Sequence, residues 1–325
     1  DELVYHEEDD TFGTYIYKTK SKKFLVIGSY STLSTECRIL EADDPNGEFR
    51  VFQSREEDHE YSIEHYEEKF YVRTNLEAKN FRLMETPLNA CAKDSWVEVI
   101  PHREDVLLEG IEVFKNYLVV EERQKGLLQI RVIEGASGQD HYLEFWEPAY
   151  TSYVSSNPDF DTDILRFGYT SMTTPSSTYT YNMKDRTKVL LKQQEVVGDF
   201  DLNNYSSERL VVKARDGAEI PVSVVYKKGF KMDGKGPLLL YAYGSYGYSM
   251  DPYFSSVRLS LLDRGFAYAI AHIRGGEDLG RQWYEDGKLL KKKNTFTDFI
   301  DCAQYLIEEK YTSQDQLFAM GGSAG

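Results

Sequence analysis

The sequence predicts a mixed fold, in which a half made of repeated β-strands is followed by an α/β half. Three observations predict it: strand-like runs that recur at a nearly fixed spacing, a later change to longer apolar strands that alternate with helical patterns, and a glycine-flanked serine directly after a short apolar strand. A chain of 325 residues has room for about two domains. We therefore expect one domain over residues 1–200 and a second over residues 201–325.

The first half contains four similar apolar runs, which begin at residues 24, 70, 117 and 165 and read FLVIGS, FYVRTN, YLVVEE and LRFGYT. Their starts lie 46, 47 and 48 residues apart, and each run is followed by a turn-rich stretch and two further strand-like runs. A period in the forties with about four short strands per unit is typical of the blades of a β-propeller. We predict part of a propeller lid domain with about four blades, and we expect further blades before residue 1. An irregular β-rich domain is the alternative.

The pattern changes at residues 199–208, DFDLNNYSSE, a polar stretch that we interpret as a linker. Two strand-like runs follow, joined by Asp216-Gly217, which is a strong hairpin signal. Continuous apolar strands are expected at 237–243 and 266–273, with a helix between them that ends at Gly265. Apolar strands that alternate with helices indicate a parallel sheet buried on both faces.

The clearest helix is expected over residues 295–310, where Thr295 and Asp298 resemble a capping box. Its apolar face is expected to hold Phe296, Phe299, Ile300, Ala303, Leu306 and Ile307, with Cys302 packed one step from it. The helix leads into the strand LFAM and then into GGSAG at 321–325. Helix, strand and sharp turn in this order are typical of the nucleophile elbow of an α/β-hydrolase. We therefore predict the N-terminal part of an α/β-hydrolase catalytic domain after the propeller.

Ser323 is the candidate nucleophile of this elbow. Glycines suit its strained backbone turn, where neighbouring side chains would clash. The backbone N–H of Ala324 is the expected donor to the oxyanion, a contribution on the order of 3 kcal/mol. The alternative is a turn serine among small residues.

A nucleophilic serine needs a base and a group that orients the base. All six histidines precede Ser323, and His272 ends a buried strand, where a structural role is expected. In this fold the acid and the histidine follow the serine, so we expect both beyond Gly325. A chain without them is expected to be nearly inactive, because loss of the histidine typically lowers kcat about a millionfold.

Three segments together resemble the prolyl oligopeptidase family of serine peptidases, and within it the oligopeptidase B branch. They are LLLYAYGSYGYSMDPYFS, LLDRGFAYAIAHIRGGEDLGRQWYEDGKLLKKKNTFTDFIDCAQYLI and GGSAG, and they cover about residues 235–325. The resemblance implies that Ser323 is the nucleophile. It also implies that the hydroxyl of Tyr243 is the second oxyanion donor, beside the Ala324 amide.

The resemblance further implies cleavage of short peptides after Arg or Lys. Asp251 matches an acid of the pocket for the residue before the cleaved one, and Tyr253 stands where related sequences carry a second acid. A tyrosine there could stack on a guanidinium. Tyr246 is similar in position to an aromatic residue of the specificity pocket. Arg274 is a candidate contact to a substrate carbonyl, with a structural ion pair as the alternative.

The composition limits the classes of molecule that the protein is expected to bind. A net charge of −16 and a pI near 4.9 argue against binding nucleic acid or an anionic membrane and favour cationic partners. The resemblance implies short basic peptides as substrates. The three widely spaced cysteines are expected to be reduced thiols in a cytoplasmic protein. We expect no metal and no cofactor, and the sequence predicts no oligomeric state. The alternatives are a proline-specific peptidase or an esterase of the same fold, and a non-catalytic propeller that binds a partner.

Overall fold

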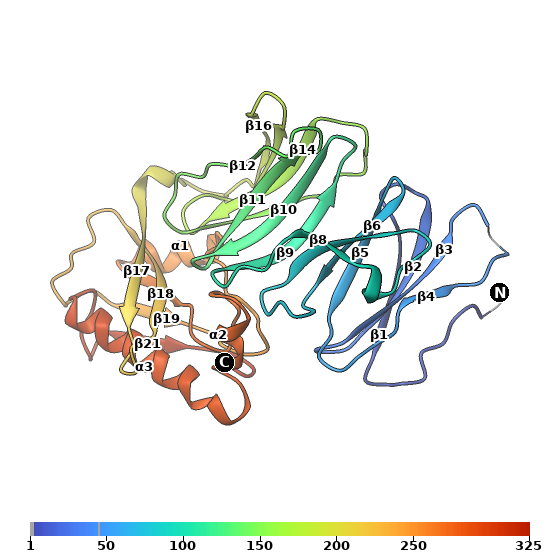
Figure 1. Cartoon of the computed structure of the whole chain (residues 1–325). Helices are drawn as coiled ribbons and strands as arrows, with labels where there is room; N and C mark the ends of the chain where they lie inside the picture. Colours follow the sequence, from blue (N-terminus) through green and yellow to red (C-terminus); the bar gives the residue numbers. More distant parts are fainter. Residues whose placement is uncertain (1–2, 45) are drawn as a thin grey trace.

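A computed structural model describes residues 3–44 and 46–325, and its first part consists of four separate four-stranded sheets (Figure 1). Each sheet takes four strands consecutive in sequence, in the order in which the chain makes them. The first two sheets are β1 (Gly13–Lys18), β2 (Phe24–Tyr30), β3 (Thr35–Glu41), β4 (Arg50–Gln53), and β5 (Tyr61–Tyr66), β6 (Lys69–Thr74), β7 (Arg82–Pro87), β8 (Val97–Ile100). The next two are β9 (Val106–Val113), β10 (Tyr117–Gln124), β11 (Leu127–Glu134), β12 (Asp140–Tyr142), and β13 (Tyr150–Val154), β14 (Ile164–Ser171), β15 (Ser177–Asn182), β16 (Thr187–Gln193).

These sheets are the predicted blades. All their strand pairs are antiparallel, and the four runs that define the sequence repeat form the second strand of each sheet. Apolar cores lie between neighbouring sheets, since Phe24 and Phe70 share one cluster and Val119 and Phe167 share another. This arrangement confirms the propeller, because a blade cannot bury its apolar faces alone.

The second part contains one five-stranded sheet in the order β17-β18-β20-β19-β21. Its elements are β17 (Tyr205–Lys213), β18 (Glu219–Lys227), β19 (Leu238–Tyr241), α1 (Ser256–Leu262), β20 (Ala267–Ala271), α2 (Arg281–Glu285), α3 (Lys293–Glu308) and β21 (Leu317–Met320). Single 3-10 turns are η1 (Lys93–Ser95), η2 (Leu202–Asn204) and η3 (Leu289–Lys291). Strands β20, β19 and β21 are parallel, as expected, but β17 and β18 are antiparallel, so the sheet is mixed.

The predicted linker is too long. Strand β17 already begins at Tyr205, which is buried, although the following Ser206, Ser207 and Glu208 read as polar loop residues. Polar residues are tolerated because β17 is an edge strand, and Glu208 accepts hydrogen bonds from the hydroxyls of Tyr226 and Tyr311. The boundary at residue 200 stays a prediction, in the interval between β16 and β17.

Helices cover both faces of this sheet. Leu238 and Leu240 of β19 face a core that contains Cys302 and Leu306 of α3. The alternate residue Leu239 packs instead on the core that holds Leu262 of α1. Because alternate strand residues point to opposite faces, α1 and α3 lie on opposite sides of the sheet, as in an α/β-hydrolase.

Helix α3 differs from its prediction in two ways. It begins at Lys293, so Thr295 and Asp298 lie inside the helix, and the predicted capping box is wrong. Both side chains are buried and bind the segment around Arg274 instead of the helix end. The predicted apolar face is confirmed in part: Cys302 and Leu306 are buried and Phe299 and Ala303 pack against the core, but Phe296 and Ile300 are exposed.

In the second and third blades, the loops that join the second and third strands contact the α/β domain. The Lys79 ammonium lies 2.8 Å from Glu285, and the Asn80 side chain accepts the Arg281 N–H at 2.9 Å. In the third blade the Lys125 carbonyl accepts a bond from Arg209 at 3.0 Å. These loops place the third blade next to the segment that follows β19, which matters for the site below.

Among the described residues, no helix combines the length and apolarity needed to cross a membrane, and no group of three or more His, Cys, Asp or Glu is placed to hold a metal ion. The three cysteines are free and buried.

Candidate active site

The candidate nucleophile lies just after the carboxyl end of β21. Ser323 is exposed and has a φ of 55°, a left-handed backbone conformation that is uncommon for a residue with a side chain. The Gly325 N–H bonds to the Gly322 carbonyl at 2.8 Å, which closes a tight turn around the serine. A strained, exposed serine between a strand and such a turn has the geometry of a nucleophile elbow.

The turn packs directly against Tyr243. Because Tyr241 is paired with Met320 in the parallel register, the chain leaves β19 and β21 at the same edge of the sheet. A Cβ atom on Gly325 would lie 2.8 Å from the Tyr243 Cα, so only glycine permits this approach. The structure thus brings together three sequence-predicted residues, Ser323, Ala324 and Tyr243.

Two residues that the sequence reasoning missed connect the loop after Tyr243 to the elbow. The Lys292 ammonium donates to the Gly244 carbonyl at 2.6 Å and contacts the Ser245 hydroxyl. The Ser245 hydroxyl in turn donates to the Ala324 carbonyl at 3.1 Å. Burial lowers the pKa of Lys292, which has no carboxylate among these partners. We interpret Lys292 and Ser245 as positioning residues; only the KKKN run could have drawn attention to the lysine.

A hollow lined by aromatic residues lies beside the elbow. Its volume is about 450 Å³, and its lining residues are Tyr241, Tyr243, Tyr246, Tyr248 and Met250. Tyr246 is exposed and also has a left-handed φ, 56°. A hollow lined by aromatic rings and hydroxyl groups next to a nucleophile is suited to hold a substrate side chain.

Asp251 directly follows Met250, the last residue of this lining. Its carboxylate binds Arg123 of the third blade, with 2.7 Å between Nη1 and Oδ1 and 3.4 Å between Nη2 and Oδ2. Tyr253, two residues on, is half exposed, and its ring centroid lies 5.7 Å from the guanidinium of Arg258. The roles of Asp251, Tyr246 and Tyr253 in substrate binding stay predictions.

Arg274 is buried in an ion-pair network. Nε and Nη2 bind the two oxygens of Asp298 at 2.9 and 2.5 Å, and Nη1 lies 2.7 Å from Asp216. The hydrogen bond to Asp298 raises the pKa of the guanidinium above its usual value. All three side-chain nitrogens have protein partners, which favours the alternative of a structural ion pair over a substrate contact.

His272 is buried, and both ring nitrogens have partners, Asp278 at 2.9 Å and the Ser223 hydroxyl at 2.8 Å. Burial and the nearby Arg209 lower its pKa, so the ring is neutral at pH 7. A structural role fits these contacts better than that of a catalytic base.

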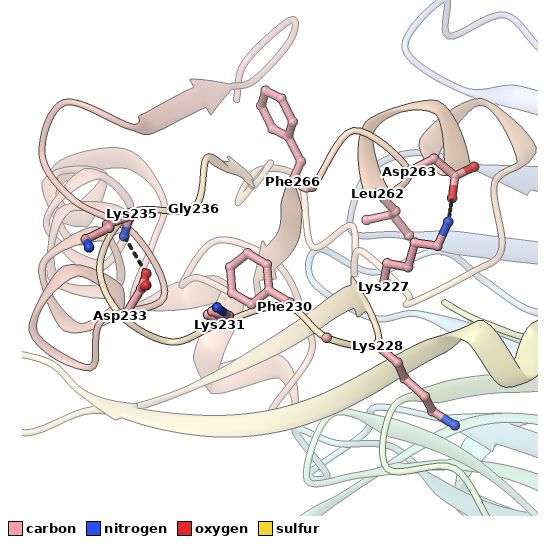
Figure 2. A pocket seen from close by; sticks show the side chains of 12 residues that line it. Lys227, Lys228, Phe230, Lys231, Asp233, Lys235, Gly236, Leu262, Asp263 and Phe266 are labelled. Carbon is pink, nitrogen blue, oxygen red and sulfur yellow. Dashed lines mark hydrogen bonds and ion pairs between the residues drawn. The ribbon is translucent and has the colours of Figure 1, made fainter.

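A second hollow lies at the other end of the sheet. Figure 2 shows its lining, in which Lys227 reaches Asp263 at 2.8 Å and Phe230 and Phe266 flank an open space of about 360 Å³. Its residues precede β19 and β20, whereas Ser323 follows the carboxyl end of β21. In sheets of this kind ligands bind at the carboxyl ends of the strands, so this hollow is not the candidate active site.

The elbow, the mixed sheet with helices on both faces and the adjoining blades define an α/β-hydrolase domain with a β-propeller. Comparison with known families agrees: residues 1–194 match the N-terminal β-propeller domain of prolyl oligopeptidase, and residues 252–325 match the prolyl oligopeptidase family. The chain belongs to the prolyl oligopeptidase family of serine peptidases. This confirms the resemblance seen in the sequence.

Individual relatives span the whole of this chain. It is 48% identical to dipeptidyl aminopeptidase BI of Pseudoxanthomonas mexicana and 38% identical to Protease 2 of Moraxella lacunata, and it covers 45% and 46% of their lengths. Oligopeptidase B from Leishmania major is similar with a TM-score of 0.92 at 36% identity, over 99% of this chain and 46% of that one. Oligopeptidase B from Trypanosoma brucei, solved with covalently bound antipain, gives 0.91 at 34% identity over 99% of this chain and 47% of that one. The chain spans about half the length of the relatives it matches.

Proposed function

We propose that the protein is a serine oligopeptidase that cleaves short peptides after Arg or Lys. The observation that carries the proposal is the exposed, left-handed Ser323 in a turn whose Gly325 packs against Tyr243 at the carboxyl edge of the sheet. The similarity to oligopeptidase B from two organisms supports the class of reaction.

In this mechanism the Ser323 oxygen attacks the scissile carbonyl carbon, and the carbonyl oxygen becomes negatively charged. The Ala324 N–H and the Tyr243 hydroxyl stabilise that charge, the C–N bond breaks, and the amine leaves with the proton taken from Ser323. Water then hydrolyses the acyl-enzyme ester. We propose that the base is a histidine outside these 325 residues, because His272 is fully bonded elsewhere.

The preference for a basic residue is the finer part of the proposal. It is supported by the resemblance to the oligopeptidase B branch and by the aromatic hollow, which can hold the stem of Arg or Lys. Asp251, directly after the lining residue Met250, is proposed to bind the side chain of the residue before that Arg or Lys. Cytoplasmic location is likewise proposed, from the three free cysteines.

The test is hydrolysis by the intact protein of matched fluorogenic peptides that end in Ala-Arg or Ala-Pro before the reporter. Preferential Arg cleavage is expected. Preferential Pro cleavage would move the assignment to a proline-specific peptidase, and ester cleavage alone would indicate an esterase. Binding of a partner that survives Ser323→Ala, without labelling by a fluorophosphonate, would favour a non-catalytic module.

A second candidate is removal of dipeptides from a free N-terminus, which the 48% identity to dipeptidyl aminopeptidase BI favours. Substrates with a free or a blocked N-terminus distinguish the two. An endo-acting oligopeptidase cleaves the blocked peptide, whereas a dipeptidyl aminopeptidase requires the free amine.

Tyr243→Phe is expected to lower kcat for peptides about 10²- to 10³-fold, because one oxyanion donor is lost while the ring remains. KM is expected to change little, since the hydroxyl acts on the transition state. Steady-state kinetics check this, with Tyr248→Phe as the matched control, because Tyr248 lines the same hollow. Equal losses in both variants would contradict an oxyanion role for Tyr243.

A further inference from the structure

Two domains meet at Asp251, directly after Met250, which lines the aromatic hollow. Asp251 belongs to the segment after β19 that also carries Tyr243 and Tyr246, whereas Arg123 belongs to β10 of the third blade. The two are 128 residues apart in sequence. Both oxygens of Asp251 face the guanidinium, in the bidentate manner that is typical of strong Arg–carboxylate pairs.

Arg123 has a second carboxylate partner. Its Nε donates to Glu109 at 2.6 Å, and its side chain is only 4% exposed. Burial lowers the pKa of Arg123, but the charges of Asp251 and Glu109 outweigh burial and raise it overall. If Asp251 changed partner, Arg123 would therefore not become an unpaired buried charge, because Glu109 would still neutralise it.

Asp251 remains partly open to solvent, with 26% of its side chain exposed. The carboxylate is thus accessible, and Met250, its neighbour in the chain, lines the hollow. A basic substrate side chain that extends past Met250 would meet a carboxylate already bound by a guanidinium.

We propose that Arg123 is an internal competitor for Asp251, which weakens selection for a basic side chain next to the residue at the cleaved bond. The inference rests on the proposed function. Arg123 mimics the substrate cation, so a basic substrate side chain has to replace it at Asp251. Arg123 then stays paired with Glu109. Selection for a basic residue before the one at the cleaved bond is accordingly coupled to the contact between the third blade and the segment after β19.

The test compares Arg-Arg with Ala-Arg fluorogenic peptides on the intact protein and reports the ratio of the two kcat/KM values. In Arg123→Met the ratio is expected to rise on the order of tenfold, the size of one charged hydrogen bond gained by the substrate. Arg123→Lys keeps a cation without the planar fork, so a smaller rise is expected. This variant also serves if the Met variant does not fold.

Two controls isolate the effect. In the Asp251→Asn background, Arg123→Met is expected to leave the ratio unchanged, because the competed carboxylate is gone. Arg281→Met removes another bond between the domains, that of Arg281 with Glu60, without touching Asp251, and it is expected not to alter the ratio.

The outcomes separate this inference from the function on which it rests. If wild-type protein cleaves Ala-Arg but the ratio stays constant in both Arg123 variants, the competitor role is wrong and the peptidase assignment stands. An equal rise in Arg281→Met would also overturn the competitor role, since general loosening of the domains would explain it. If wild-type protein cleaves neither peptide, the proposed function fails, and the inference fails with it.

Discussion

Ser323→Ala is expected to abolish peptide hydrolysis, with a loss of about a millionfold in kcat. Measured losses of a catalytic serine are of this size, because the whole covalent route disappears. Binding of substrate is expected to persist, since the aromatic hollow and Asp251 are untouched. The measurement is peptide hydrolysis together with labelling by a fluorophosphonate, which requires the serine hydroxyl.

The substitution is well suited to a functional test because it leaves the backbone unchanged. The left-handed conformation at residue 323 is about equally unfavourable for serine and for alanine, so little change in folding stability is expected. Ser260→Ala, at an exposed position of α1, is the matched control and should retain full activity. Hydrolysis in Ser323→Ala that remains within a hundredfold of wild type, in a preparation free of other peptidases, would show that Ser323 is not the nucleophile.

Much of this site is predictable from sequence because its signals are local. The elbow needs a strand, a run of small residues and a serine, all within nine residues that end at Gly325. The blades repeat the same strand pattern at a spacing that composition alone does not produce. Local patterns of this kind depend on neighbours in sequence, so they can be read without knowing the fold.

The contacts that cross the chain could not be predicted in this way. Arg123 and Asp251 read as ordinary charges in two different domains, and only the docking of the third blade brings them together. Lys292 lies in a run of lysines that is typical of a solvated surface, yet it holds the loop after Tyr243. A sequence pattern gives the charge of such residues but not their partners.

Helix α3 shows why apolar periodicity alone gives only part of a buried face. Apolar positions favoured Phe296 and Ile300 for the core, but the buried positions include the polar Thr295 and Asp298. A buried carboxylate is stable only because Arg274, 24 residues earlier, binds it with its backbone and its side chain. That pairing adds a polar residue to the buried face, and it is not visible in the helix sequence.

Asp298→Ala is expected to lower the free energy of unfolding by about 3 to 5 kcal/mol, the usual cost of removing one partner from a buried ion pair. Asp298 is fully buried and accepts three bonds from Arg274: the backbone N–H at 3.0 Å, Nε at 2.9 Å and Nη2 at 2.5 Å. Without it the buried guanidinium keeps only Asp216, which is largely solvated. Urea denaturation measures the loss as a lower midpoint with an unchanged slope.

Asp301→Ala is the matched control, because it also removes a carboxylate from α3. The partner of that carboxylate, Arg215, is solvent-exposed. A much smaller loss of stability is expected, since exposed ion pairs contribute little. Substrate binding is also expected to change in Asp298→Ala. The carbonyl of Gly275, the residue after Arg274, accepts the N–H of Gly247 at 2.9 Å, and Gly247 directly follows Tyr246 of the hollow. A raised KM in Asp298→Ala, absent in Asp301→Ala, is therefore expected. Equal losses of stability in the two variants would mean that the Arg274–Asp298 pair does not hold this part of the fold.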